Sequence, residues 1–148
     1  MAGDSIQLVV VTPVSQLLSE AVSEVTLPGA DGYLGVLPGH APLITELGIG
    51  ELSYESASGQ TGLLAIVRGF AEVLPDRVSV LAETAERPED IDLKRAQEAL
   101  KRAQETIAKG GENVDWDRAS ASLQRALVRI QVVSKHQGIN IATIHSPH

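Results

Sequence analysis

The sequence has no cysteine and only four aromatic residues among its 148 positions, namely Tyr33, Tyr54, Phe70 and Trp116. The absence of cysteine excludes a disulfide framework, a thiol nucleophile and a cysteine-ligated metal site. Because aromatic side chains are so scarce, the core has to be built from valine, leucine, isoleucine and alanine.

Long apolar runs are also missing. No run approaches the roughly 20 residues needed to span a bilayer, so no transmembrane helix is expected. The segment 1–5 has neither a basic region nor a long apolar region, so we expect no signal peptide. The net charge of −7 disfavours nucleic-acid binding, which requires a basic surface.

Basic residues are nearly absent from the first part of the chain. Residues 1–85 contain Arg68, Arg77 and ten acidic residues, whereas residues 86–148 carry ten basic and nine acidic residues. The sequence changes at the same point from a Gly/Pro-punctuated apolar pattern to helical periodicity. We therefore predict an all-β sandwich or barrel over residues 1–86, followed by an antiparallel α-helical hairpin over residues 87–136. Residues 137–148 are predicted to form a mobile tail.

Short β-branched segments separated by turn residues characterise the first part, a pattern typical of a sandwich or barrel. The GxGxxG, P-loop, HExxH and nucleophile-elbow motifs are all absent. Residues 43–49 fit either a core strand or an exposed contact surface. The strands are predicted at residues 6–11, 21–27, 33–37, 50–54, 62–67, 70–74 and 78–82.

Two heptad seams of nearly equal length characterise the second part. Pro88 and the acidic residues after it suit a helix start, and the Gly110-Gly111 pair suits a helix end. Asp115 or Asn113 is expected to cap the second helix. The seams are rich in alanine and bury little area, so the hairpin should be marginally stable alone. Their apolar positions are Leu93, Ala96, Leu100, Ala103 and Ile107, then Ala119, Leu123, Ala126, Ile130 and Val133.

Several segments resemble, in order and spacing, the epsilon subunit of F-type bacterial ATP synthases. The most specific is residues 32–43, GYLGVLPGHAPL. Residues 9–13 resemble the first strand of that family, and residues 80–86 resemble the end of its sandwich. Residues 67–73 resemble a further strand, with Arg68 in place of a more usual glycine. The resemblance extends over residues 5–135.

The resemblance implies a non-catalytic central-stalk subunit of a proton-translocating ATP synthase. The sandwich would bind the gamma subunit and the c-ring of the rotor. The hairpin would either fold back or extend into the alpha/beta catalytic head, where it would inhibit ATP hydrolysis. Such a subunit would be peripheral to the cell inner membrane on its cytoplasmic side.

The hairpin further resembles the ATP-binding form of this family, which carries an Ile/Leu-Asp-x-x-Arg-Ala motif, here residues 91–96. The resemblance implies ATP as a regulatory ligand that stabilises the retracted hairpin. No sequence feature requires Mg²⁺ or another metal. The implied ATP contacts are Glu86, Asp92, Arg95, Arg102, Arg125 and Arg129.

The spacing of these residues is compatible with binding a triphosphate. Asp92, Arg95 and Arg102 share one face of the first predicted helix. Arg118, Arg125 and Arg129 are spaced by seven and four residues on the second helix. Folding the hairpin would gather several guanidinium groups, which a triphosphate would neutralise through bidentate hydrogen bonds.

Other interpretations remain open at this level. The arginines also fit a solvated helix flank, or a surface that contacts acidic parts of the catalytic head, and Asp92 also fits a residue that only charges the first helical turn. A stand-alone ATP sensor without a rotor role is one alternative function. A small hydrolase that uses His40 with Asp31 or Glu46 is another, although no nucleophile accompanies that histidine.

Overall fold

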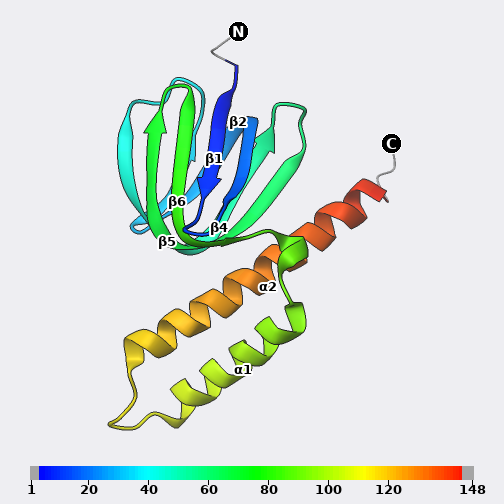
Figure 1. Ribbon diagram of the computed structural model, residues 1–148. Coiled ribbons are helices and arrows are strands. Elements are labelled where there is room, and N and C mark those ends of the chain that lie inside the picture. The colour runs from blue at the N-terminus through cyan, green and yellow to red at the C-terminus, as the bar shows by residue number, and fades with distance from the viewer. Residues whose placement is uncertain (1–3, 145–148) are drawn as a thin grey trace. The chain divides into compact units, whose positions relative to one another are not determined.

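The computed structural model describes the backbone of residues 4–144 and the side chains of residues 4–138. The chain divides into two compact units, Met1–Glu86 and Arg87–His148. Six strands lie in the first unit and two α-helices in the second (Figure 1). The predicted all-β domain followed by a helical hairpin is confirmed.

Six strands, joined by both antiparallel and parallel pairings, make up the first unit. The chain turns at residues 30–31, 57–58 and 75–76, at or beside the turn signals of the sequence. The strands are β1 (Ile6–Val11), β2 (Gln16–Gly29), β3 (Gly32–Val36), β4 (Leu43–Ser56), β5 (Thr61–Leu74) and β6 (Arg77–Glu86).

The strands form one sheet in the order β1-β6-β5-β4-β2-β3, and an additional pairing between β1 and β2 closes it. β1 runs parallel to β6 and antiparallel to β2. The first strand of the unit is therefore held between the second strand and the last. The resulting closed sandwich encloses an aliphatic core with members such as Leu8, Leu27, Leu52 and Ile66.

Four strands, β2, β4, β5 and β6, are longer than predicted. The predicted strands 62–67 and 70–74 are one continuous strand, β5, and the predicted strand 50–54 is only part of β4. Gly69, which lies between the two predicted strands, favoured separate strands in the sequence pattern because glycine weakens a strand interior. In the structure, Gly69 pairs with Leu47 of β4 and with Ala82 of β6, and this pairing on both sides carries β5 through the position.

β5 changes its inward-facing side midway along its length. Even-numbered residues such as Ile66 face the core in its first half, and odd-numbered residues such as Ala71 face it in the second half. Arg68 and Gly69 lie at the change, with φ angles of 54° and 131°. β4 makes the same change between residues 47 and 52. Such bends let one long strand contribute to both layers of a sandwich.

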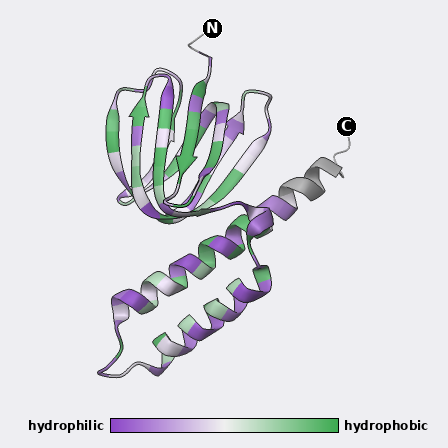
Figure 2. Cartoon of the chain, in the orientation of Figure 1, coloured by the Kyte–Doolittle hydropathy of each residue, from purple (hydrophilic) through white to green (hydrophobic). Residues whose placement is uncertain are grey.

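The second unit begins with a short 3₁₀ turn, η1 (Pro88–Asp90), followed by α1 (Leu93–Lys109) and α2 (Trp116–Ile144). Nε2 of His136 in α2 lies 3.8 Å from a carboxylate oxygen of Glu89 in η1. α1 and α2 lie side by side as an antiparallel pair (Figure 1). Figure 2 shows hydrophobic and hydrophilic residues interspersed along both helices, as expected for helices with one buried stripe.

The predicted seams are the buried stripes of this pair. All ten seam positions are buried or half-buried, and the buried ones are Ala96, Ala103, Ala119, Ala126 and Val133. α2 also buries Ala121, Val128 and Val132, which lie outside the heptad seam. The heptad periodicity of the seam did not predict that these three residues are buried.

The predicted end of the second helix near residue 136 is wrong, because α2 continues through Gly138 to Ile144. A single glycine inside a helix costs only about 1 kcal/mol relative to alanine, which is too little to end a helix by itself. Residues 145–148 of the predicted mobile tail, which include Pro147, lie outside the described residues. None of the helices within residues 4–144 has an apolar stretch long enough to cross a membrane.

Candidate functional site

Each hairpin helix starts at an aspartate that caps it. Oδ1 of Asp92 accepts a hydrogen bond from the backbone N–H of Arg95 at 3.1 Å. Oδ1 of Asp115 accepts one from the N–H of Arg118, also at 3.1 Å. Asp115 is thus the cap that the sequence left open between two candidates. Gly110 caps the end of α1 directly after Lys109, and its φ of 60° suits a glycine.

The predicted ATP contacts on α1 lie together on one exposed surface. Asp92, Arg95 and Arg102 line a shallow hollow of about 390 Å³ together with Lys94 and Glu98. The shared face that their spacing predicted is therefore present. Because Asp92 also caps α1, its carboxylate has one oxygen committed to the backbone and one left for a ligand.

The predicted ATP contacts on α2 are more buried than those on α1. Arg125 and Arg129 are half-buried, and Nη2 of Arg125 donates a hydrogen bond to Oγ of Ser122 at 3.2 Å. Neither of these two arginines lines the hollow formed by Asp92, Arg95 and Arg102. In the structure, the predicted ATP contacts of the hairpin therefore form two separate groups, one on each helix.

Glu86, the sixth predicted contact, ends β6 and belongs to the sandwich unit. It is half-buried, and its Cα pairs with that of Ala65 in β5. The structure assigns it a defined place at the end of the sandwich, directly before the hairpin unit begins.

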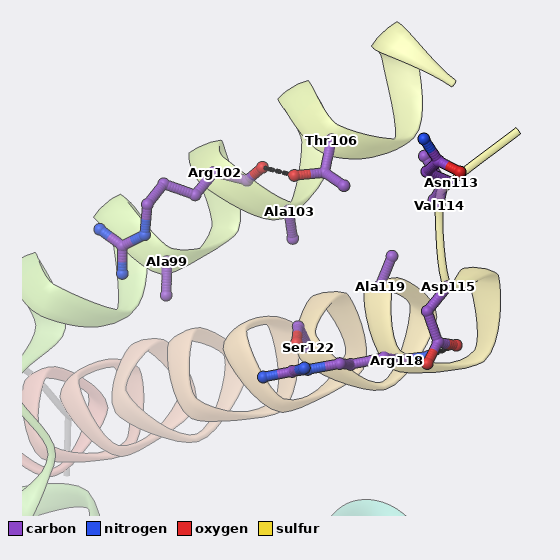
Figure 3. Close-up of a pocket in the computed structure, with 10 residues that line it drawn as sticks. All are labelled: Ala99, Arg102, Ala103, Thr106, Asn113, Val114, Asp115, Arg118, Ala119 and Ser122. Carbon is purple, nitrogen blue, oxygen red and sulfur yellow. Dashed lines mark hydrogen bonds between the residues drawn. The ribbon is translucent and has the colours of Figure 1, made fainter. Parts of the chain in front are cut away.

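A second hollow lies between α1 and α2 at the loop end of the hairpin and has a volume of about 430 Å³. Its polar lining includes Arg102 from α1 and Arg118 from α2. Figure 3 shows that Ala99 and Ala103 point toward α2 while Ala119 points toward α1. The spacing of Arg118 was noted in the sequence, but a hollow at this place was not predicted. The only signal for this hollow in the sequence was the presence of small residues at facing positions of the two helices.

An exposed apolar stripe crosses the outer face of the sandwich. Phe70 in β5 pairs with Leu81 in β6, and their side chains are 55% and 59% exposed. Glu46 in β4 also pairs with Phe70, so Ile44, two residues from Glu46, lies on the same face and is 71% exposed. We call these three residues, Ile44, Phe70 and Leu81, the apolar stripe.

A shallow hollow of about 390 Å³ adjoins the apolar stripe, and Pro13 and Gly69 also line it. Leu47, four residues along the chain from the exposed Leu43, is buried in the core. The sequence left open whether residues 43–49 form a core strand or an exposed contact surface. The structure shows that this segment contains both core and exposed residues.

His40 makes a local contact only. Its Nδ1 lies 2.7 Å from the backbone oxygen of Ala41, and the residue is half-buried. Within the described residues, neither Asp31 nor Glu46 forms an ion pair or hydrogen bond with this ring. This arrangement gives no support to the hydrolase interpretation.

Comparison with known families gives a consistent result for both units. Residues 5–88 match the beta-sandwich domain of the ATP synthase Delta/Epsilon chain, and residues 89–134 match its long alpha-helix domain. The chain belongs to the ATP synthase delta/epsilon chain family.

Similar curated relatives are ATP synthase epsilon chains of bacteria. That of Geobacter sulfurreducens is 48% identical over 134 residues, which are 90% of this chain and 96% of the relative. That of Koribacter versatilis is 53% identical over 109 residues, which are 74% of this chain and 76% of the relative. The predicted membership of the epsilon subunit family is confirmed.

Solved structures with a similar fold come from mitochondrial ATP synthases. A chain in the Euglena gracilis OSCP/F1/c-ring structure has a TM-score of 0.66 at 24% identity, covering 96% of this chain and 82% of that one. A chain in the Tetrahymena thermophila central stalk/c-ring structure has a TM-score of 0.53 at 14% identity, covering 88% of this chain and 95% of that one.

Proposed function

We propose that this chain is a non-catalytic central-stalk subunit of a proton-translocating F-type ATP synthase, where it couples the rotor to the catalytic head. The observation that carries this proposal is the apolar stripe. Three large apolar side chains on adjacent strands of one exposed face are typical of a protein interface. The family of the chain supports the same role.

In this proposal the apolar stripe packs against the gamma subunit, and the sandwich also contacts the c-ring. The strongly acidic composition of residues 1–85 favours a partner surface with basic residues. The subunit is then held at the cytoplasmic side of the inner membrane through the complex, as a peripheral component.

The docking proposal is tested by assembly with a purified alpha/beta/gamma complex. We expect Phe70→Asp and Leu81→Asp to weaken binding by about tenfold or more, because each places a charge in a desolvated contact. Val14→Asp is the matched control, since Val14 is 90% exposed and lies outside the stripe. If the stripe variants bind as well as the control, the stripe is not the interface.

We further propose that the hairpin inhibits ATP hydrolysis when it extends into the catalytic head, and that ATP favours its folded form. Two features support this regulation. Four of the ten seam positions between α1 and α2 are alanine, so these positions contribute little apolar area to holding the pair closed. Asp92, Arg95 and Arg102 also share one surface of α1.

ATP would act by preferring one of the two hairpin states. A ligand shifts such an equilibrium only by the ratio of its affinities for the two states. In the folded hairpin the α1 group and the half-buried Arg125 and Arg129 belong to the same helix pair, and Glu86 precedes it. Extension of the hairpin would rearrange these residues and weaken ATP binding.

ATP titration into the full chain by calorimetry tests this regulation. We expect one saturable site that Arg95→Ala and Arg129→Ala both weaken, whereas Lys101→Ala, which removes a neighbouring exposed cation of α1, leaves it unchanged. The absence of binding up to millimolar ATP would overturn the ATP proposal. ATP binding without affinity for the alpha/beta/gamma complex would instead favour a stand-alone sensor.

A further inference from the structure

Within residues 4–144, β3 is the one strand of the sandwich that pairs with a single neighbour, β2. Each of the other five strands pairs with two or more strands. Edge strands of natural proteins are usually protected against further pairing by a charged side chain, a proline or a bulge. β3 has the sequence Gly-Tyr-Leu-Gly-Val and contains none of these. Its outer edge is therefore open to an additional strand.

The register between β2 and β3 shows which backbone groups of β3 point outward. Gly29 and Gly32 flank a two-residue turn, so they form a hydrogen-bonded pair. Hydrogen-bonded and non-hydrogen-bonded pairs alternate along an antiparallel ladder, and Pro28, which has no N–H, accordingly lies opposite Tyr33. The N–H and C=O groups of Tyr33 and Gly35 therefore point away from β2.

These outward groups have no partner in the described part of the chain. Within residues 4–144, no hydrogen bond outside the ladder with β2 involves the backbone N–H or C=O of Tyr33 or Gly35. The Tyr33 side chain turns back across β2, where its hydroxyl accepts a hydrogen bond from the N–H of Glu51 in β4 at 3.3 Å. A Cβ atom at position 35 would have no neighbouring atom within 4 Å, so the surface of β3 is clear there.

The strands beside β3 carry acidic side chains and no lysine or arginine. Residues 1–67 contain seven acidic residues and neither type of basic residue. Glu24 in β2 lies directly opposite Glu55 in β4, and neither carboxylate forms an ion pair within the described residues. Like charges in this position repel each other, and a cation beside them would offset the repulsion. Glu24 also lines a hollow of about 260 Å³ together with Gly35 and Leu37.

We propose that β3 binds an extended segment of a partner protein as an additional strand, and that this segment carries lysine or arginine. The outward N–H and C=O groups of Tyr33 and Gly35 supply the backbone hydrogen bonds, which is the usual source of affinity in strand addition. A basic side chain of the segment reaches Glu24 across the hollow beside Gly35. A second copy of this chain fits less well, because it would bring its own acidic strands to the same edge.

This edge is separate from the apolar stripe that is proposed to bind the gamma subunit. The stripe residues lie on β4, β5 and β6, whereas the open edge belongs to β3. Binding at β3 is therefore an activity beyond the proposed central-stalk function. Phe70→Asp, which is expected to weaken assembly with the alpha/beta/gamma complex, should leave binding at β3 unchanged.

A capped peptide of about seven residues that alternates lysine and valine is a suitable probe for titration into the full chain. We expect it to slow hydrogen exchange at the amides of Tyr33 and Gly35. The amides of Leu34 and Val36 already bond to β2, so their exchange should change little. The same peptide with glutamate in place of lysine should bind at least about tenfold more weakly. Unaltered exchange at Tyr33 and Gly35 under a large excess of the lysine peptide would overturn the proposal.

Two substitutions at position 35 test the backbone pairing. Gly35→Pro removes the outward N–H but no hydrogen bond to β2, and edge strands tolerate a proline whose N–H side faces solvent. We expect it to weaken binding of the lysine peptide by about tenfold or more. Gly35→Ala keeps the N–H and is the matched control, with unchanged binding. Thermal unfolding followed by circular dichroism establishes that both variants fold. Equal affinity in the two folded variants would refute the added strand.

Charge variants test the acidic flank without altering the backbone. Glu24→Gln should weaken binding of the lysine peptide by about threefold. Glu72→Gln removes an exposed carboxylate from β5 and should have no effect. Equal weakening by both variants would show general attraction by negative charge and contradict a defined site. Sedimentation of the free chain tests the remaining occupant, because a dimer with protected amides at Tyr33 and Gly35 would show that a second copy, rather than a basic segment, fills the edge.

Discussion

Gly69 in β5 faces the backbone oxygen of Leu81 in β6 so closely that a Cβ atom at position 69 would overlap with it. The Cα of Ala82 would lie only 2.8 Å from that Cβ, and the φ of Gly69 is 131°. Steric contact with the neighbouring backbone and the positive φ therefore both require glycine here.

We expect Gly69→Ala to lower the free energy of unfolding by about 3 kcal/mol or more, because neither backbone contact can relax as a side chain would. Urea denaturation followed by circular dichroism measures the change. Gly35→Ala in β3 is the control, since its Cβ would have no atom within 4 Å. A loss at position 69 as small as that at position 35 would contradict the explanation.

Arg68 is the one non-glycine residue with a positive φ between residues 4 and 144, at 54°. A left-handed conformation costs a residue with a Cβ about 1–2 kcal/mol. We therefore predict that Arg68→Gly raises the free energy of unfolding by about 1 kcal/mol. Thermal melts of Arg68→Gly and Arg68→Ala distinguish a backbone effect from a side-chain effect. Alanine still has a Cβ atom, so the Arg68→Ala variant keeps the strain of the left-handed conformation. Equal gains in both variants would disprove a backbone origin.

The cap at Asp92 provides a test that separates structure from ligand binding. Asp92→Ala should destabilise the hairpin by about 1 kcal/mol, since the N–H of Arg95 loses its acceptor. Asp92→Asn keeps an acceptor and should remain within a few tenths of a kcal/mol of the original chain. Helical circular dichroism during thermal unfolding gives both values. A destabilised Asp92→Asn variant would show that the charge, rather than the hydrogen bond, is what stabilises the start of α1.

Adjacent positions on α2 should differ in how strongly stability depends on side-chain size. Ala126 is fully buried, so Ala126→Leu should overpack the hairpin and cost about 1–3 kcal/mol. Leu127 is 39% exposed, and Leu127→Ala should cost less than about 1 kcal/mol. Denaturant unfolding monitored at the helical signal compares them. A more stable Ala126→Leu variant would show that the helices can separate to accept the added volume.

The hairpin was largely predictable from the sequence because its signals are local. The steps of three and four between Leu93 and Ile107, the acidic residues at the helix starts and Gly110 at the end of α1 all act within one or two turns. The end of α2 was missed, because Gly138 looks like a breaker in isolation while its neighbours continue the helix.

The sandwich strands were predicted in position but not in length. Whether β5 continues through Arg68 and Gly69 depends on β4 and β6 lying on either side of it, and no local pattern contains that information. The hollow between Arg102 and Arg118 was missed for a similar reason. It depends on how α1 and α2 approach each other at small side chains, which is a tertiary property.

The position of β1 has a consequence for biosynthesis. Residues 7–11 pair with residues 77–81 at the far end of the unit, so the sheet closes only after nearly all of residues 1–86 are available. A chain emerging from the ribosome must keep β1 paired with β2 alone until β6 arrives, because closure depends on contacts distant in sequence. The hairpin, whose contacts are local, has no such requirement. During synthesis the slow step of folding therefore belongs to the sandwich, and it ends at the point in the chain where the hairpin begins.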